Sequence, residues 1–115
     1  MKEALEVLKN EMISDYERFQ NRGRSWEERT EIQARMLEEF INGIEFEKGR
    51  KYIKVIDGAG NQRTVWGFIV NCDNDKKFRR GDILKAASWS APARNFARGN
   101  VLDGDLECVR WAGAN

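Results

Sequence analysis

The chain has 115 residues, 41% hydrophobic and 34% charged, and a formal net charge of +1, which indicates a single soluble domain with a modest core. This charge balance is too even for a protein that binds duplex DNA in bulk, because such proteins carry a stronger basic footprint. The chain contains no histidine, which removes the commonest general base, disfavours an enzyme and argues against a zinc site.

Two features bear on the compartment. No apolar run approaches the roughly 20 residues that span a bilayer, and the charged start Met1–Glu6 resembles a helix rather than a signal peptide. We therefore expect a cytoplasmic protein that does not enter a membrane. Cys72 and Cys108 do not form a C-x-x-C pair, so both are expected to be free thiols.

The two halves of the chain differ in charge. Residues 1–48 carry 8 Lys and Arg against 12 Asp and Glu, a net charge of −4. Residues 49–115 carry 12 against 7, a net charge of +5. An anionic ligand is therefore expected in the second half.

Residues 2–21 have the apolar spacing of an amphipathic helix. Its expected buried face consists of Leu5, Leu8, Met12, Tyr16 and Phe19. A break follows at 21–24, with Gly23 as a C-terminal cap.

A second helix is expected to begin at Ser25, with Glu28 completing a capping box, and to end at Gly43. Its expected apolar face consists of Ile32, Met36, Leu37, Phe40 and Ile41. The short connection predicts an antiparallel helical hairpin, which we expect to serve in oligomerisation.

Strand-like patterns begin after Gly49. The segments 51–56 and 64–70 flank a glycine-rich turn at 57–61, which predicts a β-hairpin. Segment 64–70 is apolar on both faces and is expected to be central. Further strands are expected at 83–87 and 106–111. The predicted fold is one α+β domain over 1–115, with the helical hairpin (1–48) packed on a four-stranded, mostly antiparallel sheet (49–115).

The loop 89–100 has the composition of a site for a small anionic, partly aromatic ligand. Arg94 and Arg98 suit phosphates, Asn95 and Asn100 suit polar edges, and Trp89 and Phe96 suit stacking on a base. In the alternative interpretation the arginines pair with helix carboxylates and the aromatic rings belong to the core. A loop of this length is more often functional than a short turn.

Other charged groups are weaker candidates. Arg22, Arg24 and Arg29 form a second candidate anion site, or pair locally with nearby glutamates. The basic run 76–80 is either a nucleic-acid contact or a solvated connection between strands. Asp73, Asp75 and Asp82 match neither a calcium loop nor a Mg²⁺ motif, so we expect turn residues. No metal, cofactor or catalytic residue is predicted.

Part of the chain resembles a family of small tailed-phage proteins, the anti-Thoeris sponges. The resemblance covers residues 49–102 and is carried by Gly-Asp-Ile-Leu-Lys-Ala-Ala-Ser-Trp at 81–89, Ala-Pro-Ala at 91–93 and Ala-Arg-Gly-Asn at 97–100, after the strand 50–56. It implies a non-enzymatic protein that captures cyclic ADP-ribose signals made by bacterial TIR-domain defence proteins. It also implies that Arg98 and Asn100 contact the ligand, that Phe96 stacks, and that symmetric oligomers form pockets between subunits.

These observations lead to one main expectation. The protein is a homo-oligomeric, non-catalytic phage-type sponge that sequesters a cyclic nucleotide immune signal in the host cytoplasm, with loop 89–100 as its site. The alternative is a small phage protein that binds nucleic acid or inhibits a host protein through residues 76–80 and the same loop. A carboxylate-based nucleotide hydrolase ranks last, since no paired-acid or metal motif is present.

Overall fold

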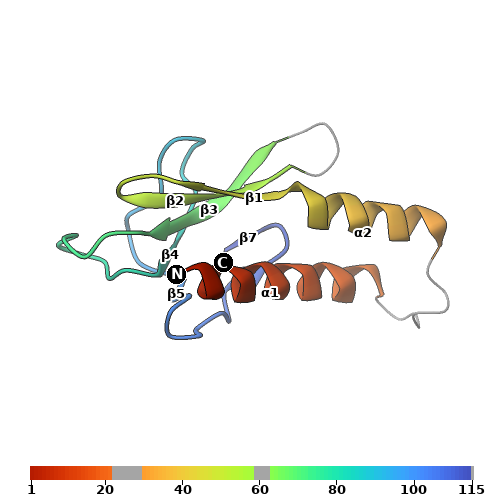
Figure 1. The fold of residues 1–115 in the computed structure, drawn as a ribbon, viewed down its shortest axis with the longest axis horizontal. Coiled ribbons are helices and arrows are strands. Elements are labelled where there is room, and N and C mark those ends of the chain that lie inside the picture. Colours follow the sequence, from red (N-terminus) through yellow and green to blue (C-terminus); the bar gives the residue numbers. More distant parts are fainter. Residues whose placement is uncertain (22–29, 59–62, 115) are drawn as a thin grey trace.

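The fold was analysed in a computed structural model that describes residues 1–21, 30–58 and 63–114 (Figure 1). Two helices precede a five-stranded sheet with the order β1-β2-β3-β4-β5, in which every neighbouring pair is antiparallel. The elements are α1 (Lys2–Gln20), α2 (Glu31–Gly43), β1 (Ile44–Lys48), β2 (Tyr52–Asp57), β3 (Thr64–Val70), β4 (Asp82–Lys85), β5 (Gly99–Asn100), β6 (Val109–Arg110) and β7 (Gly113–Ala114). The predicted α+β class is confirmed. Among the described residues, no helix is long and apolar enough to cross a membrane.

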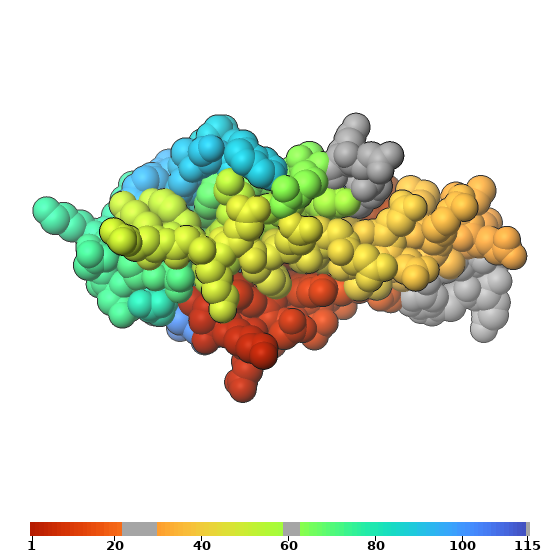
Figure 2. Space-filling view, turned by 45° about the horizontal axis from the view of Figure 1, so that its top comes forward, coloured from red at the N-terminus to blue at the C-terminus, as the bar shows by residue number. Residues whose placement is uncertain are grey.

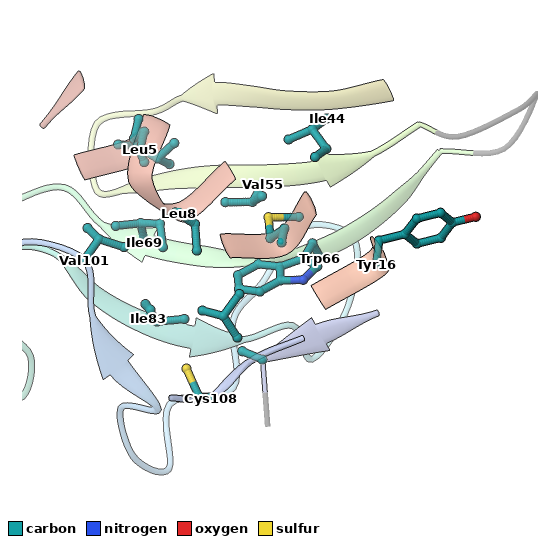
Figure 3. Close-up of a cluster of buried hydrophobic side chains, with 14 of the residues drawn as sticks. Leu5, Leu8, Tyr16, Ile44, Val55, Trp66, Ile69, Ile83, Val101 and Cys108 are labelled. Atoms are coloured by element: carbon teal, nitrogen blue, oxygen red, sulfur yellow. The ribbon is translucent and has the colours of Figure 1, made fainter. Parts of the chain in front are cut away.

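Helix α1 covers one face of the sheet and forms the main core with it. Leu8 and Met12 are fully buried, and Leu5 and Tyr16 are nearly so. Figure 3 shows Leu5 and Leu8 beside Val55, Ile69 and Trp66 of the sheet, and Met12 and Tyr16 belong to the same cluster of buried residues. Phe19 is 47% exposed, because the last turn of α1 extends past the sheet (Figure 1). The predicted face of α1 is therefore confirmed except at this residue.

Helix α2 projects beyond the sheet and leads directly into β1 (Figure 1). Thr30 caps it, with its hydroxyl accepting from the Gln33 N–H and the Gln33 side chain accepting from the Thr30 N–H. The predicted box at Ser25 and Glu28 and the cap at Gly23 lie outside the described residues. The end at Gly43 is confirmed.

The apolar residues of α2 divide into two groups. Leu37 and Phe40 are buried, and the Phe40 ring stacks on Tyr16 with centroids 4.6 Å apart. Ile32 and Met36 are 61% and 48% exposed, so their predicted place on the buried face is wrong. They lie on the part of α2 that extends away from the sheet, where α1 covers only one side of the helix.

The centre of the sheet follows the sequence closely. β3 has the predicted bounds 64–70 and pairs with β2 and β4. Both of its faces are buried, as expected. Phe68 and Val70 belong to a second apolar cluster with Phe78 and Leu84, on the face opposite α1.

The edge and the C-terminal end of the sheet differ from the prediction. β1 was not predicted, and the sheet begins at Ile44 rather than at 49. The strand expected at 106–111 is wrong. Only Val109–Arg110 is extended, and it pairs with β7 because the chain turns at 111–112. The Trp66 indole N–H donates to the Arg110 carbonyl at 2.7 Å, which fixes this small hairpin beneath α1.

Candidate functional site

The loop that follows β4 folds back over the face of the sheet opposite α1. Its backbone returns to β4 through the Ala93 N–H, which donates to the Lys85 carbonyl, and the Arg98 N–H, which donates to the Ile83 carbonyl. Ala86 and Ala97 pack against the second apolar cluster. The loop therefore covers this face of the sheet. Its candidate ligand-binding residues have different surroundings along the loop.

Asn100 is a buried residue whose side chain forms hydrogen bonds within the protein. Its side chain is almost fully enclosed, with 3% of the residue exposed. The amide nitrogen donates to the Arg80 carbonyl and to Asp82 Oδ1, while the amide oxygen accepts from the N–H groups of Leu102 and Asp103. Every polar atom of the Asn100 amide is used in holding the chain around β4 and β5, so it is not placed to read a ligand.

Phe96 and Arg98 form a pair of their own. The Arg98 guanidinium lies 4.0 Å from the centroid of the Phe96 ring, a cation–π contact. Its Nε is buried and has no hydrogen-bond partner within the described chain. Phe96 is 54% exposed, and the neighbouring Asn95 accepts from the Phe96 N–H at 3.0 Å. This pair keeps one aromatic ring at the surface.

Trp89 is not a core residue. It is 43% exposed, and Lys54 Nζ lies 4.4 Å from its ring while the Arg63 guanidinium lies 5.7 Å away. The indole therefore rests on the outer surface of β2 with cations around it.

Arg94 lies at an open cleft of about 470 Å³. The cleft lies between the turn that joins β1 to β2, the segment after β3, and the loop. Its lining residues are Arg50, Lys51, Cys72, Asn74, Asp75, Lys76 and Arg94. Figure 2 shows the first two segments, coloured lime and green, side by side at one end of the molecule.

Asp75 organises this cleft from within. Its side chain is 1% exposed and pairs with Arg94, whose Nη2 donates to Oδ1 at 3.0 Å. Arg94 Nη1 lies 3.0 Å from Oδ2, which has no hydrogen-bond partner within the described chain. Oδ1 also accepts from the N–H groups of Lys77 and Phe78, and Lys51 Nζ lies 3.7 Å from Oδ2. The hydrogen bond from Arg94, followed by those two backbone N–H groups, holds the pKa of Asp75 far below its ordinary value.

Two anchors fix the wall opposite Asp75. The Gly49 N–H donates to the Tyr52 carbonyl at 2.8 Å, and a Cβ on Gly49 would meet that oxygen at 2.9 Å, so the tight turn requires glycine. The Asn71 N–H donates to the Lys51 carbonyl at 2.8 Å. The Tyr52 hydroxyl accepts a short hydrogen bond from Arg94, which links the turn to the loop.

The charge of the cleft is strongly one-sided. Four cations line it, and among the described lining residues Asp75 is the only carboxylate. Asp75 is shared by Arg94 and Lys51, whereas Arg50 and Lys76 have no ion-pair partner within residues 1–21, 30–58 and 63–114. Arginine and lysine at such an open hollow are suited to bind a phosphate group.

The basic run at 76–80 offers fewer unpaired positive charges to a ligand than its sequence suggests. Arg79 pairs with Asp103, and Arg80 forms a bidentate pair with Asp73. Asp75 and Asp82 accept hydrogen bonds from backbone N–H groups in their turns, as expected of turn residues, whereas, within the described chain, Asp73 pairs only with Arg80. No group of three His, Cys, Asp or Glu in the described residues could hold a metal. Arg22, Arg24 and Arg29 lie outside the described residues.

Of the residues that line the cleft, the sequence predicted Arg94 as a ligand contact and Lys76 only within a run that either contacts nucleic acid or is a solvated connection; it did not predict Arg50 or Lys51. The sequence did contain a signal for these two cations, because the four residues Lys48-Gly49-Arg50-Lys51 include three cations.

The cleft also contains a partly exposed thiol, Cys72. The other cysteine, Cys108, is 7% exposed, and burial raises the pKa of its thiol.

The chain was compared with known proteins. The model of a family of unknown function (DUF7717) matches residues 1–114. The chain belongs to this family. No curated protein and no solved structure gives a significant match.

Proposed function

We propose that this DUF7717 protein is a non-catalytic binding protein that sequesters a small nucleotide-derived ligand through its phosphate groups. The observation that carries the proposal is the cationic cleft, in which Arg50 and Lys76 lack ion-pair partners among the described residues while Arg94 and Lys51 are held in place by Asp75. A cyclic ADP-ribose isomer or a cyclic oligonucleotide has the required phosphates. The resemblance of residues 49–102 to phage sponges supports the same class of ligand.

The state of Asp75 favours binding over turnover. A general acid or base works best with a pKa near the working pH, whereas the pKa of Asp75 is held far below that range by Arg94 and two backbone N–H groups. Its carboxylate is also enclosed, with 1% of the side chain exposed. It therefore serves to position cations, and the chain has no histidine to act in its place.

Capture of a signal in competition with a host receptor requires nanomolar affinity, about −12 kcal/mol. A single open cleft rarely reaches that value, because much of the ligand stays in contact with water. We therefore propose that the protein acts as a homo-oligomer in which a second copy covers the ligand.

The test combines thermal stabilisation with mass spectrometry. The purified protein is mixed with cyclic ADP-ribose isomers and cyclic di- and trinucleotides, and any stabilising ligand is released by heat and weighed. A ligand released intact supports sequestration, and one released in cleaved form overturns it. Lys76→Ala should reduce the thermal shift, with Lys2→Ala on α1 as the matched control. If no member of the panel stabilises the protein, the small-ligand proposal fails.

A second candidate function rests on a different observation. The exposed rings of Trp89 and Phe96 each lie beside a cation, Lys54 and Arg98 respectively, an arrangement suited to stacking on single-stranded nucleic acid. Oligonucleotide binding that weakens steeply with added salt would support this function. No binding at low salt would exclude it.

A further inference from the structure

A second hollow adjoins the cationic cleft on the other side of the turn that joins β1 to β2. It has a volume of about 280 Å³ and shares Arg50 and Lys51 with the cleft. Tyr52, Lys54 and Ser90 also line it. Its volume is just below the roughly 300–1,000 Å³ of typical ligand sites, so it suits one part of a ligand rather than a separate molecule.

Tyr52 joins the two hollows. Its hydroxyl accepts from Arg94 at the cleft, while its ring lines the second hollow beside Phe68. The two rings meet edge to face, with centroids 5.9 Å apart and an interplanar angle of 69°. Because it is fixed at both ends, the Tyr52 ring is a pre-oriented surface next to the shared cations.

The second hollow differs from the cleft in the groups it offers. It is lined by Tyr52, by the nearly buried Phe68, by Glu47, and by Ser90, whose hydroxyl makes no hydrogen bond within the part of the chain that the structure describes. Lys51 Nζ lies 5.6 Å from the centroid of the Tyr52 ring. Lys54 lies at its margin, with Nζ 4.4 Å from the Trp89 ring. One partly exposed tyrosine ring with a free hydroxyl in the same hollow suits the planar, uncharged part of a nucleotide, since bases stack on aromatic rings and present polar edges.

We propose that the two hollows form one bipartite site, in which the cationic cleft binds phosphates and the Tyr52–Ser90 hollow binds the nucleoside joined to them. This inference rests on the proposed function and narrows it. The ligand class is a nucleoside linked to two or more phosphates, with Arg50 and Lys51 at the junction. Inorganic pyrophosphate is expected to fill only the first part of the site.

Calorimetry with three probes tests the proposal on the full chain: ADP, inorganic pyrophosphate and adenosine. We expect ADP to bind about tenfold more tightly than pyrophosphate, because stacking of one base contributes roughly that factor. Ser90→Phe fills the second hollow, so it should reduce ADP binding to the level of pyrophosphate and leave pyrophosphate binding unchanged. Lys76→Ala should weaken both probes by the same factor.

Substitutions of Tyr52 provide a second, independent test of the nucleoside-binding hollow. This test remains available if the Ser90→Phe variant fails to fold. Tyr52→Phe keeps the ring and should keep the preference for ADP over pyrophosphate. Tyr52→Leu removes the ring and should abolish that preference. Thermal melts establish that each variant is folded.

The outcomes separate the two proposals. Equal affinity for ADP and pyrophosphate, or a Ser90→Phe variant that loses both probes alike, overturns the bipartite site and leaves phosphate binding intact. If neither ADP nor pyrophosphate binds, both proposals are overturned. A twelve-residue oligothymidylate that binds far more tightly than ADP, in a manner sensitive to Ser90→Phe, would assign the same site to a nucleic-acid strand and overturn the nucleotide class.

Discussion

The loop 89–100 and the turn 48–51 show why residue type alone does not locate a site. The loop has two arginines, two asparagines and two aromatic rings, yet Asn100 is enclosed by four hydrogen bonds and Arg94 is paired with Asp75. The turn is short and looks like a simple connection, yet its Arg50 has no ion-pair partner among the described residues. A polar side chain is available to a ligand only when the fold has not already used it.

The largest expected effect concerns a loop residue that the fold uses. Asn100→Ala removes a buried amide and leaves the Arg80 carbonyl, Asp82 and two N–H groups without their partner. We expect a loss of about 3 kcal/mol in the free energy of unfolding. Urea denaturation monitored by tryptophan fluorescence measures it. A change below about 0.5 kcal/mol would show that Asn100 is not a structural residue.

Ligand binding should distinguish the cleft from the loop. Lys76→Ala is expected to weaken binding of the stabilising nucleotide about tenfold to a hundredfold, because hydrogen bonds to charged groups contribute about 1.5–3 kcal/mol. Arg98→Ala should change it no more than about twofold, the effect of a substitution away from the contact. Isothermal titration calorimetry measures both. If Arg98→Ala weakened binding more than Lys76→Ala did, the binding site would lie at the Phe96–Arg98 part of the loop and not at the cleft.

The pH dependence of stability tests the role of Asp75. The pKa of Asp75 in the folded protein lies below that in the unfolded chain, so its contribution to stability is complete above about pH 5. As the pH falls further, the unfolded chain takes up the proton first and the contribution is lost. The difference in urea midpoint between the wild type and Asp75→Asn should therefore be constant from pH 5 to 8 and shrink below pH 4. A difference that grows on acidification would contradict the pairing with Arg94.

The smallest expected effect concerns α2. Some of its apolar residues are buried in the core, whereas others stay exposed and available to a partner. Leu37 and Phe40 are used in the core, whereas Ile32 and Met36 remain exposed on α2. If copies of the chain associate through this face, Met36→Lys should weaken association about tenfold, since burying one such side chain contributes about 1.5–3 kcal/mol. Light scattering across a concentration series measures the mass. A wild-type monomer at every concentration would exclude homo-oligomerisation.

The fold could be predicted where one face or both faces of an element are consistently apolar. β3 was located to the residue because Trp66, Phe68 and Ile69 leave no polar face. β1 was missed because it follows α2 without a turn and carries Glu45 and Glu47 on its outer face, where Arg63 pairs with both. At the C-terminal end, the apolar pattern at 106–111 records burial under α1 and not membership of the sheet.

The site was only partly predictable for a physical reason. Arg50, Lys76 and Arg94 are far apart in the chain and meet only because β2, β3 and the loop after β4 are neighbours in space. Sequence can show that each is a cation, as it did for Lys76 and Arg94. It cannot show that Asp75 neutralises one of them and leaves the others available.

If the cleft binds phosphates as proposed, the two differently placed thiols would let the wild-type protein report on its ligand. Cys72 opens onto the cationic cleft and Cys108 is buried beneath the sheet, so a maleimide dye would attach at one position without mutagenesis. An environment-sensitive fluorophore there would change its emission when phosphates entered the cleft. Such a labelled protein could follow the appearance of its own ligand in a crude extract, before that ligand has been purified.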